Sequence, residues 1–94
     1  MSGALLVGLD AEMANACERF VDPYPVLRVA HAAAAVARIC VVHPKVVVIT
    51  SALREEEARE VREAAAILGA DVIIAFPDRA VDVPPLLLAA LERA

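Results

Sequence analysis

The segment Lys45-Val46-Val47-Val48-Ile49-Thr50-Ser51 contains four consecutive β-branched apolar residues, followed by two hydroxyl residues. β-branched side chains favour extended backbone, and an apolar run without polar alternation is typical of a strand covered on both faces. Such strands belong to parallel sheets, because crossover helices cover both faces of those sheets. We therefore expect a central parallel strand here. Its carboxyl end should lie at the edge where open α/β sheets bind their ligands.

Three further apolar segments alternate with helical patterns on either side of this strand. We expect the other strands at residues 4–9, 26–30 and 71–76, and helices at 10–21, 32–42, 53–68 and 84–93. Alternating strands and helices predict a parallel sheet with right-handed crossovers. The predicted fold is α/β: a three-layer α/β/α domain over residues 1–94, with a four-stranded parallel sheet of strand order 2-1-3-4.

Capping residues set the expected ends of the helices. Asp10 and Ser51 are predicted N-caps, because short polar side chains accept hydrogen bonds from the first free amides of a helix. Gly69 is expected just after the end of the third helix, where a left-handed residue is common. Residues 39–42 are rich in β-branched side chains and would also suit a strand. We favour helix there, because the following His43-Pro44 pair lacks the chemistry of a tight hairpin turn.

Two faces and one loop complete the expected packing. In the first helix, the inward face is predicted to carry the four apolar residues Met13, Cys17, Phe20 and Val21. Val36, Ile39 and Cys40 are expected to point inward from the second helix. Arg28, in the middle of the second strand, indicates an outer position in the sheet. Residues 77–82 are expected to form a loop.

Composition excludes several classes of protein. The net charge is −4, only 3% of residues are aromatic, and the basic residues are scattered, so we expect no nucleic-acid binding. The alanine-valine stretch 32–42 is about half of a bilayer-spanning length and contains Arg38, so we expect no membrane insertion. Asp10 and Glu12 interrupt the first apolar run, which argues against a secretion signal. We expect a cytoplasmic protein.

The cysteines and histidines show no spacing of a metal or redox site. Cys17 and Cys40 form no CxxC pair, and we expect both to be reduced and packed as small apolar side chains. His31 and His43 are not spaced as metal ligands. Three scattered glycines cannot form a phosphate-binding loop. We therefore predict no catalytic residue, metal or cofactor.

Asp10, Thr50 and Ser51 are the polar residues expected at the carboxyl edge of the sheet. Together with nearby helix N-termini, they would form a site for an anion or another small ligand. The other interpretation is that each of them only caps a helix. The ligand site is kept as the alternative function.

Several segments resemble those of one signalling family. Residues 5–10 end in an acid after a strand, residues 32–48 lead through a helix into a strand, and residues 48–52 end a strand at threonine and serine. Gly69-Ala70-Asp71 and the following strand to Pro77 resemble a "GAD…KP" segment. With these segments the chain resembles a response-regulator receiver domain of the CheY-like, flavodoxin-like type.

The resemblance implies a receiver that has lost its phosphorylation chemistry. A full receiver has five strands and is longer than this chain. Phosphoryl transfer to aspartate needs a carboxylate nucleophile, a divalent metal and a cation. Here Thr50 stands where the family has its aspartate or its switch residue, Phe76 replaces the lysine, and Asp10 is the single acid of the metal-binding pair. The chain is therefore expected to be a truncated pseudo-receiver.

The remaining candidate is an interaction surface. The fourth strand is expected at a sheet edge without a lysine or an interior proline to guard it, and the last helix is apolar on several sides. We expect a protein partner or a second copy of the chain to cover them, which gives a non-enzymatic signalling module that acts through dimerisation or partner docking. The predicted interface residues are Val72, Ile74, Phe76, Leu86, Leu87, Leu88 and Leu91.

Overall fold

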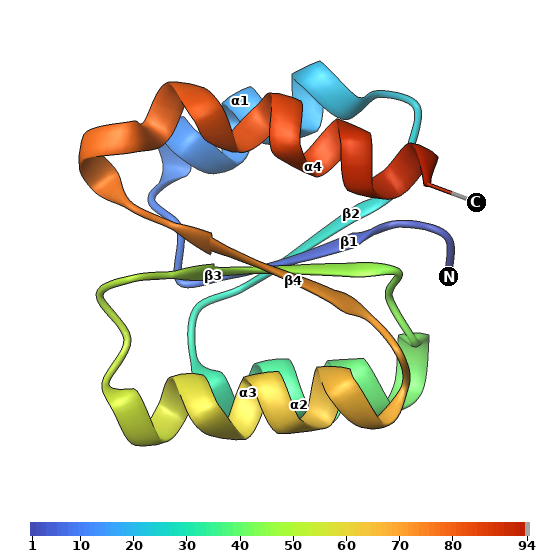
Figure 1. Ribbon diagram of the computed structural model, residues 1–94, viewed down its shortest axis with the longest axis vertical. Coiled ribbons are helices and arrows are strands. Elements are labelled where there is room, and N and C mark those ends of the chain that lie inside the picture. Colours follow the sequence, from blue (N-terminus) through green and yellow to red (C-terminus); the bar gives the residue numbers. More distant parts are fainter. Residues whose placement is uncertain (94) are drawn as a thin grey trace.

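The computed structural model describes residues 1–93, and strands and helices alternate along this part of the chain (Figure 1). The strands are β1 (Ala4–Val7), β2 (Val26–Val29), β3 (Val46–Thr50) and β4 (Asp71–Ala75). The α-helices are α1 (Ala11–Val21), α2 (Ala32–Val42), α3 (Glu55–Ile67) and α4 (Val83–Glu92). A short 3₁₀ helix, η1 (Pro77–Asp82), leads into α4, in the segment that we predicted to be a loop.

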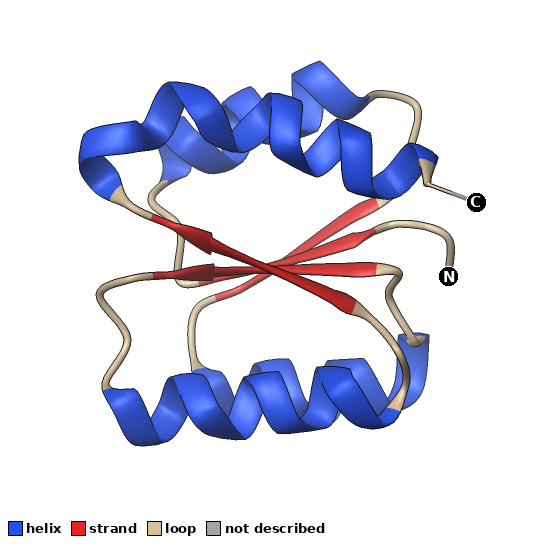
Figure 2. Ribbon diagram, viewed as in Figure 1, coloured by secondary structure: helices blue, strands red, loops and turns tan. Residues whose placement is uncertain are grey.

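The sheet confirms the predicted fold class and strand order. All three pairings are parallel, and the order is β2-β1-β3-β4. Helices α1 and α4 cover one face of the sheet, and α2 and α3 cover the other (Figures 1 and 2). The architecture is therefore α/β/α in three layers, consistent with a receiver-like, flavodoxin-like fold.

The two central strands hold the core together. Every residue of β1 and the first four residues of β3 are at most 1% exposed. Their side chains alternate between two clusters, as extended backbone requires. Leu6 and Val48 pack with residues of α1 and α4, whereas Leu5 and Val47 pack with residues of α2 and α3. The unbroken apolar run in β3 thus packs against the helices on both faces of the sheet, as its sequence predicts.

Several predicted helix ends are confirmed. The Asp10 carboxylate accepts a hydrogen bond of 2.8 Å from the Met13 amide and caps α1. Helix α2 continues to Val42 and ends at His43 in the left-handed conformation, so residues 39–42 are helical. Gly69 follows α3 with a φ of 71°, and the next amide, that of Ala70, donates to the Ala65 carbonyl. This is the glycine-terminated helix end that we expected.

The start of α3 was predicted wrongly. Ser51 is not its N-cap, and the helix begins four residues later, at Glu55. The Ser51 amide instead donates to the Ala75 carbonyl at 2.9 Å and so extends the contact between β3 and β4. The Leu53 amide then donates to the Thr50 carbonyl at 3.3 Å. Non-helical backbone therefore occupies residues 51–54, and α3 starts two residues later than the predicted helix of residues 53–68.

Two side chains predicted to face inward lie at the surface. Phe20 is 50% exposed, because the buried stripe of α1 runs through Ala14, Cys17 and Val21. Cys40 is exposed, whereas its neighbour Ile39 is buried. Arg28 is exposed on the edge strand β2, so the outer position predicted for this strand is confirmed.

Candidate functional site

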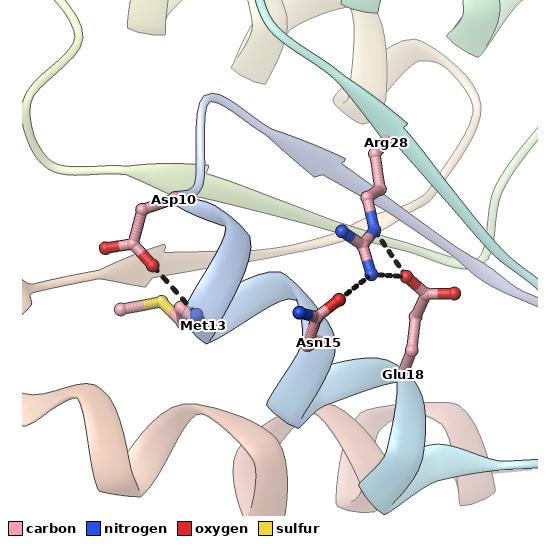
Figure 3. A network of polar contacts seen from close by, with 5 residues as sticks. All are labelled: Asp10, Met13, Asn15, Glu18 and Arg28. Atoms are coloured by element: carbon pink, nitrogen blue, oxygen red, sulfur yellow. Dashed lines mark hydrogen bonds and ion pairs between the residues drawn. The ribbon is translucent and has the colours of Figure 1, made fainter.

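The carboxyl edge of the sheet carries Asp10, Thr50 and Ser51, the three predicted ligand-binding residues. The Asp10 carboxylate is engaged by the Met13 amide, as Figure 3 shows. The hydroxyl of Thr50 accepts a hydrogen bond of 3.2 Å from the Ala52 amide. Ser51 follows in the exposed turn after β3. The side chains of Asp10 and Thr50 therefore bind local backbone, which agrees with a structural role for them.

A hollow of about 360 Å³ opens beside Asp10, between the start of α1 and the η1–α4 segment. Thr50 and Ser51 do not line it, so the structure does not bring the three predicted residues into one cavity. Asp10 and Glu12 supply the charges of the lining, and no cation accompanies them there. The hollow is thus unsuited to an anion. The lining residues are Asp10, Glu12, Met13, Ala16, Pro77, Ala80, Val81 and Pro84.

The ends of the strands do not bring together the groups that phosphoryl transfer to aspartate requires. The residue at the end of the central strand is Thr50, which has no carboxylate. Among residues 1–93, no three histidine, cysteine, aspartate or glutamate side chains gather closely enough to bind a metal ion. A threonine at this place can cap a turn, and it does so here through its hydroxyl.

The two cysteines lie in different environments. Cys17 is fully buried on the inward face of α1, and Cys40 is exposed on α2; both are free thiols. Burial raises the pKa of the Cys17 thiol, and the positive charge of Arg28 partly opposes this shift. Cys17 is therefore a protonated core residue at neutral pH, while Cys40 is accessible to solvent. The prediction that both pack as apolar side chains holds only for Cys17.

The two edges of the sheet are built differently. β2 has four residues, and its central Arg28 reaches α1 (Figure 3). There the guanidinium donates to the Asn15 side chain at 2.7 Å and forms an ion pair with Glu18. A charge in the middle of an edge strand discourages the addition of another strand. β4 has no such guard, because its single charged residue is Asp71, at its first position.

The surface next to this unguarded strand exposes large apolar side chains, and the charged side chains of Arg79 and Asp82 lie among them. Phe76 is 47% exposed and Leu86 is 54% exposed, although both are large apolar side chains. A shallow hollow of about 150 Å³ lies between them and is lined by Ile74, Phe76, Arg79, Asp82, Val83 and Leu86. We call the outer side of β4 at Val72 and Ile74, together with the flanking side chains of Phe76 and Leu86, the β4–α4 edge. The Val72 and Ile74 side chains themselves are partly buried against the α2–α3 layer.

The burial of two α4 leucines contradicts part of the predicted interface. Leu87 is 0% exposed and Leu91 is 2% exposed, so neither can contact a partner. Both pack in the core cluster that includes Leu6 and Val48, because this side of α4 faces the sheet. Leu88 is half-buried against the same cluster. Of the four predicted leucines, only Leu86 is largely exposed.

A second apolar surface was not predicted from the sequence. A groove of about 570 Å³ runs between α2 and α3, and Ile67 beside it is 82% exposed. The signal in the sequence was the position of Ile67, which lies off the buried stripe Ala58, Val61 and Ala65 of α3. The groove is lined by Val36, Cys40, Glu60, Glu63, Ala64, Ile67 and Leu68.

No protein-family model and no curated protein matches this sequence. In the described part of the chain, every helix is too short or too polar to cross a membrane.

Proposed function

We propose that this protein is a non-enzymatic, cytoplasmic signalling module, a truncated pseudo-receiver that binds a protein through its β4–α4 edge. The observation that carries the proposal is the open side of β4, which is flanked by Phe76 and Leu86 at 47% and 54% exposure. Exposed apolar patches next to an unguarded strand are typical of interaction surfaces. The partner would supply the cover that a fifth strand and its helix supply in a full receiver.

Independence from phosphorylation is the second part of the proposal. Thr50 offers a hydroxyl where the family would use a carboxylate, and Phe76 offers no cation for a transferred phosphoryl group. Incubation with magnesium and acetyl phosphate should leave the intact mass of the protein unchanged. A stable phosphoryl adduct on the folded protein would refute this part of the proposal.

Partner binding can be tested by comparing two surfaces of similar character. Phe76→Glu combined with Leu86→Glu places charges on the β4–α4 edge. The control, Ile67→Glu, places a charge on an apolar position of α3 that is 82% exposed. Bait protein should capture a specific partner from the native cell, and the double variant should lose that partner while the control retains it. If only the Ile67→Glu control loses the partner, the interface lies at the α2–α3 groove and not at the β4–α4 edge.

The alternative is a small-ligand site at the carboxyl edge of the sheet, in the hollow beside Asp10. Because Asp10 and Glu12 line this hollow, a neutral or cationic small molecule suits it better than an anion does. Glu12→Gln should then abolish ligand binding, measured by calorimetry, and leave partner capture intact. Thr50→Ala, outside the hollow, is the matched control.

A further inference from the structure

The hydrogen bonds at both ends of β4 fix which of its peptide groups face outward. The Asp71 amide donates to the Lys45 carbonyl at 3.0 Å, and the Ala75 carbonyl accepts from the Ser51 amide at 2.9 Å. In a parallel ladder, alternate residues direct both their N–H and C=O groups to the same neighbouring strand. Asp71, Ile73 and Ala75 therefore bond to β3. Val72 and Ile74 direct their N–H and C=O groups away from it, to the side where residues 1–93 supply no further strand.

We propose that these groups bind a second copy of the chain, so that two β4 strands pair antiparallel about a two-fold axis through Ile73. The result is a homodimer with one continuous eight-stranded sheet. This inference rests on the proposed function, because it uses the β4–α4 edge, and it names the partner. A closed two-fold dimer requires the antiparallel direction, since the axis reverses the strand that it generates.

The axis through Ile73 gives the register in which every outward group finds a partner. Val72 then lies opposite Ile74 of the second copy, and each of these two pairs exchanges both of its hydrogen bonds. Ile73 lies opposite Ile73 of the second copy in a non-hydrogen-bonded pair, with a Cα–Cα distance of about 4.5 Å. The four bonds involve groups that make no other backbone bond within the described residues.

The neighbouring registers are less favourable. An axis through Val72 would place Ile74 opposite Ala70, whose amide already donates to the Ala65 carbonyl at 2.9 Å. An axis through Ile74 would place Val72 opposite Phe76, whose carbonyl already accepts from the Arg79 amide at 2.9 Å. An axis between two residues would place Ile73 opposite Val72 or Ile74, so that outward peptide groups would face a residue whose own groups are bonded to β3. An axis through Ile73 is therefore the position at which all the paired peptide groups are free of other hydrogen bonds.

Charge complementarity supports a second copy as the occupant. Antiparallel pairing places the first residue of β4, Asp71, near the end of β4 in the other copy, where Arg79 lies in η1. Arg79 forms no ion pair with any residue in the range 1–93. The Asp71 side chain is 44% exposed and already forms an ion pair with Arg93 at 3.0 Å, so in the dimer its carboxylate would be shared between Arg93 and Arg79 of the second copy. Asp71 is held beside Arg93 at the end of α4, and Arg79 lies in η1 at the start of α4. Asp71 of one copy and Arg79 of the other would therefore lie on the same face of the joined sheet. The contact occurs twice by symmetry.

The apolar surface also becomes covered. Phe76 and Leu86, about half exposed in the single chain, lie at the rim of the proposed contact. The same pairing is unfavourable for β2, because it would bring together two copies of Arg28. A chain of 94 residues buries a modest fraction of its surface, so added cover contributes strongly to its stability.

A cysteine cross-link tests the register directly. Ile73→Cys is made in a Cys40→Ser background, and copper phenanthroline with dissolved oxygen serves as the oxidant. The two introduced thiols, one from each copy, would lose two protons and two electrons to oxygen and form a disulfide, since a Cα–Cα distance of about 4.5 Å permits the bond. We expect a covalent dimer on non-reducing gels. Ile67→Cys, an exposed control on α3, should remain uncross-linked at the same concentration.

Sedimentation equilibrium of the unmodified chain tests the dimer without a new cysteine. We expect a dimer at micromolar concentration. Either Arg79→Asp, or Asp71→Arg made together with Arg93→Asp to keep the ion pair within the chain, should raise its dissociation constant about tenfold. All three substitutions combined should restore the dissociation constant to within about threefold of the original. A monomer at tens of micromolar, or a dimer in which the Ile73→Cys variant does not cross-link, would overturn the inference.

The outcomes separate this inference from the proposed function. If the chain is monomeric but the Phe76→Glu and Leu86→Glu variant loses a captured protein, the inference fails and the proposed function stands, with a foreign partner on β4. If the Ile73→Cys variant cross-links but the double glutamate variant retains every captured protein, the dimer stands and partner docking at the β4–α4 edge fails.

Discussion

Gly8 and Thr50 are in close contact at the carboxyl ends of β1 and β3, where a Cβ added to Gly8 would lie 2.8 Å from Cγ2 of Thr50. Gly8 has a φ of 72°, a conformation that side chains other than glycine rarely adopt. The Thr50 methyl group thus fills the space between the strand ends, and its hydroxyl caps a turn. This packing explains why Thr50 does not line the hollow beside Asp10.

Gly8→Ala should destabilise the protein more than Gly69→Ala. Both residues have φ near 70°, but a Cβ on Gly69 meets nothing within 4 Å. Gly69→Ala should therefore reduce the free energy of unfolding by about 1 kcal/mol through backbone strain alone. Gly8→Ala adds the clash with Thr50, which costs about 1–3 kcal/mol more. In a Thr50→Ser background the two alanine variants should become similar in urea denaturation. Strict additivity of Gly8→Ala and Thr50→Ser would contradict the contact.

Asp10→Ala should reduce the free energy of unfolding by about 1 kcal/mol, because it removes the N-cap of α1. Ser51→Ala is the matched control. Ser51 makes its structural contact through its backbone amide, which alanine retains, so its effect should stay within about 0.5 kcal/mol. Equal losses in chemical denaturation would show that Ser51 caps a helix after all.

Leu87→Ala and Leu86→Ala should differ sharply although the residues are neighbours. Leu87 is 0% exposed in the core, and its truncation should reduce the free energy of unfolding by about 2–5 kcal/mol. Leu86 is 54% exposed, so Leu86→Ala should change the stability of the isolated chain by about 0.5 kcal/mol or less. Thermal and urea unfolding at a concentration below dimer formation would measure both. A large loss for Leu86 alone would place α4 in another rotation about its axis.

The two thiols should react with Ellman's reagent at different rates. Exposed Cys40 should react promptly at pH 8, and buried Cys17 only after unfolding, because its raised pKa keeps it protonated. Above its ordinary pKa of 9.0, the Cys17 thiol ionises in the unfolded chain first. The free energy of unfolding should therefore fall as the pH rises above that value. In Cys17→Ala this pH-dependent fall in the free energy of unfolding should be smaller. An identical pH profile in the variant would show that the Cys17 thiol does not cause the fall.

Much of the fold could be predicted because the relevant residues determine it locally. The run 46–49 is apolar at every position, and only burial on both faces accommodates such a strand. Asp10 and Gly69 act within one turn of their own helices, so their roles are visible in the sequence. The rules of crossover connections predict parallel pairing once four strands alternate with helices, but they allow several strand orders, and 2-1-3-4 was the one that we favoured.

The wrong predictions concern residues whose position depends on contacts distant in the sequence. Ser51 is a good N-cap by type, but its amide bonds to the Ala75 carbonyl on β4, and a turn separates it from the start of α3. Leu87 and Leu91 cannot be distinguished from Leu86 by type, and only the packing of α4 on the sheet selects which of them is buried.

The candidate site was predicted only in part for the same reason. The carboxyl edge could be located, because parallel strands end together. Which residues share a cavity there could not be predicted, since the hollow beside Asp10 is completed by Pro77 and Pro84, which lie far from Asp10 in the sequence.

Arg28 has a consequence for how far assembly can proceed. In the proposed dimer the two β4 strands pair with each other, and the two β2 strands become the outer edges of the joined sheet. Each outer edge carries an Arg28 held by Asn15 and Glu18, which opposes docking of another strand. If the proposed dimer forms, its growth should therefore stop at two subunits, because the side chain that makes β2 a poor partner would also oppose polymerisation into filaments.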